Sequence, residues 1–522
     1  MKDELTITIA NWAGVNTGDD AIFSSLLNVL KSAVSSKLTV YVLADNEKEI
    51  QRKFHSVAGT APIFEYYKPQ HLPRVLGFLR RSDLVIYGGG DLINGDLCSM
   101  SFLRLAKLMG VPVMCCSVGA LPLQSSFQRF FTRRALNCMD AITVRDESSK
   151  DRLQALGVDK VPIQATADLA FLLLPKLDGN RLLENNGHSG ASMTIGVNVR
   201  SQDEMYYFYS TWDEDKFLDT VASVCNRIIS DLDAHIVFLP METCERKKYY
   251  HTQVFDETIG HRILGNIERK DRFSMLAREY TPDELKGLLS HMDLLIAMRL
   301  HTLLIASDQG IPMVAFDYAP KLHSFMSQIG REDFLVDTTD LSEEGIMEKV
   351  RTALQDEGWR DKERVRSLCK RSQENVDVIK DVLETKEADH RKFYTHLPLV
   401  PLFVASNYAI DLVLAVKGRS ARKTKRRRRP FSPVSTGSEK LFNPSLIQPF
   451  MVSPQVEKLF NSLKSAGIVS EDKAVSAEKA TSLSKLPKAQ CMNALAELEK
   501  MGAVKKRKKN NAVDYYLVKT AL

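Results

Sequence analysis

Short apolar runs, each ending at a glycine or a polar residue, alternate with helical patterns in the first part of the chain. The runs that we predict to be strands cover residues 5–10, 38–43, 84–87, 113–118 and 141–144. Most are nearly continuous in their apolar character, which is typical of strands buried on both faces. The alternation predicts a parallel β-sheet with helices on both sides.

The same alternation restarts after residues 178–192, which are rich in Gly and Asn and are predicted to form a linker. Further strands are predicted at residues 195–199, 235–239, 294–298 and 313–316. We therefore expect an α/β chain with two doubly wound, Rossmann-like domains, 1–177 and 193–392. Two such halves with a cleft between them resemble the two-domain glycosyltransferases of the GT-B type.

Residues 393–449 differ in character and are predicted to form an apolar and basic segment followed by a linker. The apolar stretch 397–416 has about the length of a membrane span, but two prolines, Asn407 and Asp411 interrupt it. A helix lying on a membrane would be drawn to anionic lipid by the nine Lys and Arg within 417–429. The alternative is a helix packed on the rest of the protein, followed by a solvated basic linker.

Residues 450–522 have the outline of a small α+β, winged-helix-like domain, with three predicted helices followed by two short strands around a basic turn. Such domains bind DNA through a helix in the major groove and a basic wing on phosphate, and others bind proteins. Lys485, Lys488 and Gln490 would lie at or near the recognition helix. Nucleic acid and protein therefore both stay open as partners of this domain.

Composition and charge indicate the class of protein and the compartment in which it works. The chain has 522 residues, 44% hydrophobic and 26% charged, which is typical of globular protein, and its net charge of +6 is concentrated in the C-terminal region. No signal peptide is expected, because the chain opens directly into a predicted strand. The eight cysteines contain no C-x-x-C pair, which argues against disulfides and a metal site. A cytoplasmic location is predicted, with peripheral attachment to the inner face of the membrane left open.

Cationic and proton-exchanging side chains follow two of the predicted strands. Arg299 and His301 come directly after residues 292–298, and Tyr318 and Lys321 follow the next run. In open α/β sheets, ligands bind outside the carboxyl ends of the strands. An arginine holds oxyanions with a planar fork of donors, and a histidine exchanges protons near neutral pH. These residues predict a site for a small substrate with several negative charges.

The order and spacing of five short motifs resemble the polysaccharide pyruvyl transferase family over about residues 6–335. The motifs are Asn16-Thr17-Gly18-Asp19, Gly88-Gly89-Gly90-Asp91-Leu92, Arg145-Asp146-Glu147-Ser148, Ala167-Asp168 and Met298-Arg299-Leu300-His301. The resemblance implies a GT-B-like fold and transfer of a pyruvyl group from phosphoenolpyruvate to a sugar of a cell-surface glycan or its lipid-linked precursor. It also implies that no nucleotide-sugar donor is used, and we expect no cofactor.

By the same resemblance, Arg299 and His301 lie in the donor pocket. We expect Arg299 to bind the phosphate or the carboxylate of the donor and His301 to act as general acid and base. The downstream Tyr318 and Lys321 belong to the same motif. Lys321 is expected either to bind phosphate or to be a solvated loop residue.

Further candidates for substrate binding lie at other strand ends. Arg145 could hold the donor or pair with Asp146, and Arg200 is expected at the donor. Asp19 is expected either to cap the following helix or to hold an acceptor hydroxyl, with Asn16 shaping the loop. Asp91 or Asn94 could face the acceptor sugar.

The sequence leaves a second role open for Glu242 and two alternative functions open for the chain. Glu242 could be an acid or base partner but is expected to be an ordinary loop carboxylate. A nucleotide-sugar-dependent glycosyltransferase shares the fold class and is one alternative function. The other is a regulator without enzymatic activity, in which the C-terminal domain binds DNA and the larger part only resembles a transferase.

Overall fold

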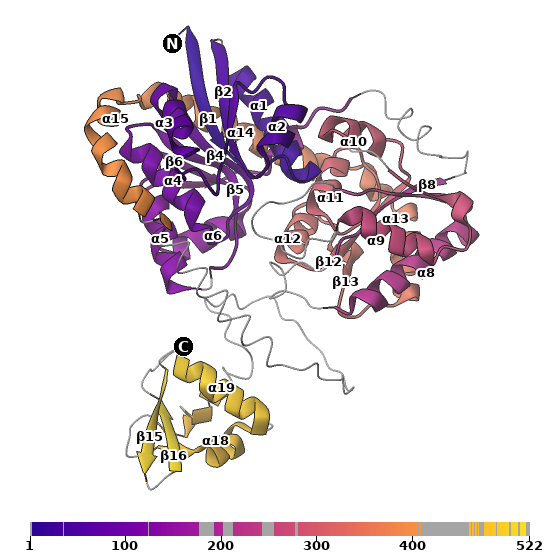
Figure 1. Ribbon diagram of the computed structural model, residues 1–522. Helices are drawn as coiled ribbons and strands as arrows, with labels where there is room; N and C mark the ends of the chain where they lie inside the picture. The colour runs from indigo at the N-terminus through magenta and orange to yellow at the C-terminus, as the bar shows by residue number, and fades with distance from the viewer. Residues whose placement is uncertain are drawn as a thin grey trace. The chain divides into compact units, whose positions relative to one another are not determined.

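The computed structural model describes residues 3–408 apart from 35, 124, 177–192, 202–211, 243–254, 277–279 and 406. It also describes residues 459–517 apart from 461, 464, 467, 469–473, 487, 501–502 and 510–511. The chain forms two compact units, Met1–Arg428 and Arg429–Leu522 (Figure 1). The larger unit contains two parallel sheets, and the smaller unit contains a three-stranded antiparallel sheet. The predicted linker 178–192 lies outside the described residues.

The first sheet has seven parallel strands in the order β3-β2-β1-β4-β5-β6-β7. Their bounds are β1 (Glu4–Ala10), β2 (Lys37–Ala44), β3 (Gly59–Pro62), β4 (Leu84–Ile93), β5 (Val113–Ala120), β6 (Ala141–Val144) and β7 (Ile163–Ala165). The strand order reverses between β1 and β4, and this is the point where ligands bind in doubly wound sheets.

The second sheet has six parallel strands in the order β10-β9-β8-β11-β12-β13. Their bounds are β8 (Met193–Asn198), β9 (Ala234–Phe238), β10 (Phe273–Met275), β11 (Leu294–Ala297), β12 (Met313–Asp317) and β13 (Leu335–Asp337). The fold prediction of two Rossmann-like sheets is confirmed. The edge strands β3, β7, β10 and β13 were not predicted, because none of them is a continuous run of four apolar residues such as the short β11.

Helices cover both faces of these sheets (Figure 1). The first set is α1 (Thr17–Ala33), α2 (Glu47–Lys53), α3 (Leu72–Arg81), α4 (Leu97–Leu108), α5 (Ser126–Leu136) and α6 (Glu147–Ala155). The second set is α8 (Glu214–Leu232), α9 (Asp256–Gly265), α10 (Pro282–Leu289), α11 (Leu300–Ser307), α12 (Pro320–Gln328) and α13 (Glu343–Gln355).

Successive side chains of the central strands enter two different cores. In β5, Met114 and Cys116 pack into one core, whereas Val113 and Cys115 pack into the other. This alternation follows from the two-residue repeat of a strand and requires cover on both faces. The core that contains Met114 continues into the second sheet, so it joins the two halves of the larger unit.

After the second sheet the chain returns to the first one. Helix α14 (Glu363–Thr385) places Asn375 among buried hydroxyls of the first half, where its Oδ1 accepts from Thr143 Oγ1 at 2.5 Å and from Thr166 Oγ1 at 3.2 Å. On the same helix, Ser372 Oγ donates to the carbonyl of Asp168 at 2.9 Å. The helix therefore holds the segment that follows β7, which carries part of the site described below.

The following segment also packs on the first half. Helix α15 (His390–His396) lies beside α4 (Figure 1), and His396 Nδ1 is 2.7 Å from the carbonyl oxygen of Leu108. Asn407 is fully buried and donates to the hydroxyls of Tyr66 and Ser101 at 3.2 and 2.9 Å. For residues 397–408 these contacts favour the packed helix over the interfacial one. The rest of the apolar and basic segment lies outside the described residues.

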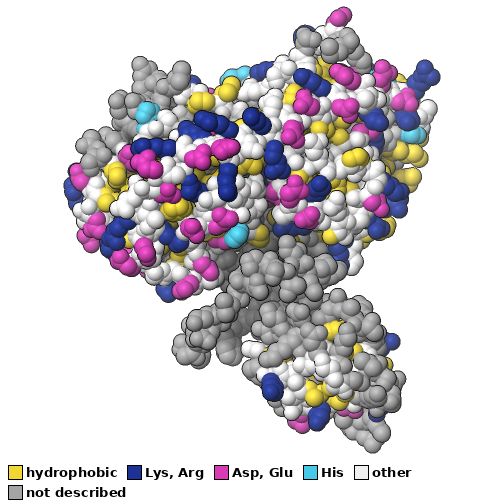
Figure 2. Space-filling model, turned by 180° about the vertical axis from the view of Figure 1, so that it is seen from behind, with side chains coloured by type: hydrophobic (Ala, Val, Ile, Leu, Met, Phe, Trp, Pro, Cys, Tyr) yellow, Lys and Arg dark blue, Asp and Glu magenta, His cyan; other side chains and the backbone are white. Residues whose placement is uncertain are grey.

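None of the described helices combines the length and the apolar composition that a bilayer crossing needs. Acidic and basic side chains are interspersed over the face shown in Figure 2, with hydrophobic side chains in small groups between them.

The smaller unit packs its described helices against its sheet. It contains β14 (Val475–Ser476), α18 (Ala477–Ser484), α19 (Lys488–Lys500), β15 (Val504–Lys509) and β16 (Ala512–Leu517), with the strand order β14-β16-β15. Its core includes Leu459, Leu463, Leu495, Leu498 and Leu517.

We predict that Asn375→Ala destabilises the larger unit by about 3 kcal/mol, because it removes a shared acceptor from buried hydroxyls. The measurement is the shift in the unfolding midpoint in urea. Gln373→Ala, at an exposed position on the same helix, is the matched control and should change stability by less than about 0.5 kcal/mol. Equal stability of the two variants would contradict this account of α14.

Candidate active site

The candidate residues gather where strands of both sheets end. Arg145 follows β6 and Asp168 follows β7 in the first half, whereas Arg299 follows β11 and Lys321 follows β12 in the second half. Each is delivered by a parallel strand whose carboxyl end faces the same rim. Contacts such as those of Lys321 with Asp91 and of His301 with Asp168 join the two halves, so the rim forms one site.

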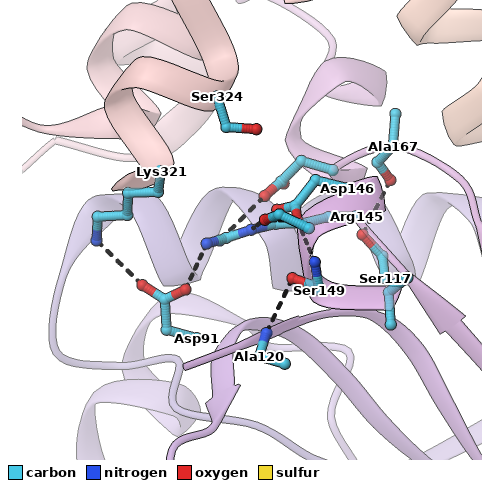
Figure 3. Close-up of polar contacts among 12 residues, drawn as sticks. Asp91, Ser117, Ala120, Arg145, Asp146, Ser149, Ala167, Lys321 and Ser324 are labelled. Atoms are coloured by element: carbon cyan, nitrogen blue, oxygen red, sulfur yellow. Dashed lines mark hydrogen bonds and ion pairs between the residues drawn. The ribbon is translucent and has the colours of Figure 1, made fainter. Parts of the chain in front are cut away.

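The carboxylate of Asp91 lies between two cations that come from different halves (Figure 3). It accepts a hydrogen bond from Arg145 Nη2 and another from Lys321 Nζ, the latter at 3.0 Å. All three side chains are largely buried. Lys321 is therefore part of the site and not a solvated loop residue.

Arg145 has further acidic neighbours in the first half. Its Nε is 3.4 Å from Asp146 Oδ2 and its Nη1 is 3.6 Å from Asp168 Oδ2. Asp146 also caps α6 by accepting from the backbone of Ser149 at 2.7 Å. Burial would raise the pKa of Asp146, but Arg145 and the hydrogen bonds from Ser148 and Ser149 hold that pKa below its usual range.

A pocket surrounds these groups and adds a cation that sequence reasoning missed. It is lined by Asp91, Ala120, Leu121, Arg145, Asp146, Ser148, Ser149, Arg152, Ala319, Pro320 and Lys321. Arg152 Nη1 donates to Ser148 Oγ at 3.0 Å, four residues back on the same helix. That helical spacing was the signal in the sequence, since residues i and i+4 share a face.

His301 lies in the first turn of α11 and faces the first half. Its Nε2 is 3.7 Å from Asp168 Oδ2, and neither of these buried atoms has a hydrogen-bond partner among the described residues. At this distance the attraction is electrostatic. Burial alone would raise the pKa of Asp168, but His301 and Arg145 together hold it below its usual range. Asp168 belongs to one of the five sequence motifs, but no role was predicted for it.

The ring of His301 packs directly against Gly18 of α1. A Cβ added at Gly18 would fall well inside van der Waals contact of the Nδ1, Cγ and Cβ atoms of His301. The motif around residue 18 and the motif around residue 301 therefore meet in space, and the glycine makes room for the imidazole.

Arg299 lies in a second group of charges, beside Glu242 and Asp256. Its Nη2 donates to Glu242 Oε2 at 2.8 Å and to Asp256 Oδ1 at 2.5 Å, whereas its buried Nε has no partner among the described residues. Burial would lower the pKa of Arg299, but the two carboxylates raise it, so the guanidinium stays charged. Glu242 is buried and paired, so the expectation of an ordinary loop carboxylate was wrong.

Arg200 and Tyr318 connect the two groups of charges. The guanidinium carbon of Arg200 and the ammonium of Lys321 each lie 5.9 Å from the centre of the Tyr318 ring. Arg200 also acts electrostatically on Arg299. The structure thus brings Arg145, Arg200, Lys321 and Arg299 to one rim.

The residue that caps helix α1 differs from the one that was predicted. Asn16, not Asp19, caps the helix, and its side chain accepts from the backbone of Asp19 at 2.9 Å. Asn16 also forms a β-bridge with Glu242 of the second half. The Asp19 carboxylate lies against Gly90, which has a positive φ of 81°. Strand β4 runs on to Ile93, past residue 87, where it had been predicted to stop.

Within the described residues, no group of three His, Cys, Asp or Glu side chains could hold a metal ion. The chemical character of the rim is instead that of buried arginines, a lysine and a histidine. Arg145, Arg299, His301 and Lys321 each lie close to a carboxylate. Such a site can bind a small anion of high charge and exchange a proton with it.

Known proteins resemble this chain in sequence and in fold. The chain is 24% identical over 293 residues to the amylovoran biosynthesis protein AmsJ of Erwinia amylovora, covering 55% of this chain and 69% of that protein. Its fold is similar to the crystal structure of a Listeria monocytogenes protein assigned as a UDP-N-acetylglucosamine 2-epimerase, with a TM-score of 0.50, 12% identity and coverage of 74% and 98% of the two chains. That likeness supports the GT-B-like fold alone. Residues 16–320 match the model of the polysaccharide pyruvyl transferases, and the chain therefore belongs to that family of transferases.

Proposed function

We propose that this chain transfers a pyruvyl group from phosphoenolpyruvate to two hydroxyls of one sugar in a polysaccharide or its precursor. One observation carries the proposal beyond family membership. Arg299 Nε and His301 Nε2 are buried and have no hydrogen-bond partner among the described residues. His301 lies 3.7 Å from Asp168, which in turn lies 3.6 Å from Arg145 in the lining of the pocket. Buried polar atoms normally have partners, so a ligand is the expected one.

The reaction joins an enol phosphate to a diol and releases phosphate. A proton added to the methylene carbon makes the neighbouring carbon, C2, oxocarbenium-like, and a sugar hydroxyl bonds to C2 and loses its proton. The bond from C2 to the phosphate oxygen then breaks, and a second hydroxyl of the same sugar bonds to C2 and gives up its proton. The products are one ketal and one inorganic phosphate.

We assign the two anionic groups of the donor to the cations of the rim. Arg145 and Lys321 would hold one group, aided by the hydroxyls of Ser148 and Ser149 that line the same pocket. Arg299 and Arg200, with Tyr318 beside Arg200, would hold the other. Cations fixed in a buried site stabilise the departing phosphate more strongly than the same cations in water.

We assign proton transfer to His301, with Asp168 as the carboxylate that positions it. At 3.7 Å, Oδ2 of Asp168 attracts the charged imidazole without a hydrogen bond to Nε2, so Nε2 stays available to the substrate. Two hydrogen bonds fix Asp168. Its carbonyl accepts from Ser372 Oγ of α14, and its carboxylate accepts from the backbone N–H of Ala170 at 3.0 Å. The acceptor would then approach from the side of Asn16, Asp19 and Asp91.

The test is an acceptor screen with labelled phosphoenolpyruvate. We expect inorganic phosphate to be released only when a suitable glycan or lipid-linked sugar is present, and the label to appear in that sugar. Transfer of a sugar from a nucleotide donor, with release of a nucleotide diphosphate, would replace the proposal by the glycosyltransferase alternative.

Once the screen has identified an acceptor, His301→Asn should lower turnover by roughly 100- to 10,000-fold, the usual loss when a general acid or base is removed. His323→Ala, at an exposed histidine on α12, is the matched control and should retain wild-type turnover. His301 is a sharper target than Arg299, because removing Arg299 would leave two buried carboxylates without their counter-ion and destabilise the fold. Turnover of His301→Asn within threefold of wild type would remove His301 from the mechanism.

Gly18→Ala should lower turnover by about 100-fold while the protein stays folded, because the new methyl group displaces the imidazole of His301. Alanine is favoured over glycine in a helix, so a loss of activity would come from the contact with His301 and not from α1 itself. Gly77→Ala in α3, where an added Cβ meets nothing within 4 Å, is the control. Unchanged turnover in Gly18→Ala would show that the position of the imidazole is not critical.

A further inference from the structure

The smaller unit contains a basic hairpin that the proposed transferase reaction does not use. We propose that this unit binds duplex DNA, with strand β15 on the phosphate backbone and the exposed face of α19 in the major groove. The proposal stands independently of the proposed catalytic function, because it rests on different residues in a different compact unit.

The described elements have the arrangement that such binding needs. Helices α18 and α19 are joined by three residues, and the first of these, Lys485, has a positive φ of 52°, which turns the chain sharply between the helices. Two helices joined by so short a turn form a helix-turn-helix, whose second helix enters the major groove. The hairpin of β15 and β16 follows directly, and β14 pairs with β16 to attach it to the helices.

The two faces of α19 differ in chemistry. Cys491, Ala494, Leu495 and Leu498 are buried in the core of the unit. Gln490 and Asn493, one turn apart, are exposed on the other side of the helix. Glutamine and asparagine side chains pair with the adenine edge in the major groove through two hydrogen bonds, so the exposed face carries groups that read bases.

Strand β15 carries the positive charge of the unit. Its last five residues, 505–509, are all Lys or Arg, and residues 455–522 together contain 13 Lys and Arg against 7 Asp and Glu. Lys505 is exposed, whereas Lys506 is paired with Glu499 of α19 at 2.5 Å. That pair ties the strand to the proposed recognition helix. The hairpin thus presents cations next to α19, as a protein that contacts phosphate beside the groove requires.

These features favour DNA over a lipid surface. Charge alone draws a basic element to an anionic bilayer, but stable attachment also draws on apolar side chains that enter the bilayer. In the described part of the hairpin, Val504, Tyr515 and Leu517 are instead buried in the core. The exposed amides of α19 have no role at a lipid surface but do have one at base edges.

The test is fluorescence anisotropy of the full chain with a labelled duplex of mixed sequence over a range of salt concentrations. We expect saturable binding, with a logarithmic salt slope that falls by about 2 in the double variant Lys505→Gln/Arg507→Gln, because each lost phosphate contact removes about 0.9. The matched control Arg366→Gln/Lys370→Gln, at exposed positions of α14, should leave the slope unchanged. Both variants should keep wild-type transferase activity.

Three results would overturn the proposal. One is no saturable binding of the duplex at 100 mM salt. Another is duplex binding that the Lys505→Gln/Arg507→Gln variant leaves unchanged, which would assign it to the basic run 417–429. The third is binding of vesicles made of phosphatidylserine and phosphatidylcholine, or of an acidic peptide, that the same variant weakens while the duplex does not bind.

Discussion

The carboxylate of Asp91 accepts hydrogen bonds from Arg145 and Lys321, and these two cations belong to opposite halves of the larger unit. Two cations held this close in a buried setting repel each other strongly unless an anion lies between them. The position of the second half against the first at this rim therefore depends on a negative charge. In our account the donor supplies further negative charge at the same place, so its binding and the approach of the two halves are coupled.

Other charged side chains at the rim also lie next to groups of opposite charge. Arg299 is held by Glu242 and Asp256, and Asp168 lies between Arg145 and His301. Burying charges is costly unless each finds a partner, so the site is assembled as pairs. At the rim, Arg299 Nε and His301 Nε2 are buried nitrogens that have no hydrogen-bond partner among the described residues. They are the atoms that an anionic substrate would satisfy.

The sequence predicted the strands that carry the site because each is a nearly continuous apolar run that ends at a polar residue. Arg145, Arg299, His301 and Lys321 could be found in this way, since carboxyl ends of parallel strands meet at one rim. Asp256 and Arg152 were missed because they lie on helices, where a charged residue is usually solvated. The contact of Gly18 with His301, and the return of α14 to the first sheet, depend on tertiary packing that no local pattern encodes.

The most direct measurement is a crystal structure of the full chain with phosphoenolpyruvate bound. Our account predicts the phosphate or carboxylate of the donor within hydrogen-bonding distance of Arg145 and Lys321, with its methylene carbon on the side of His301. A donor bound away from both cations, with Asp91 still joining them and His301 facing only protein, would contradict it.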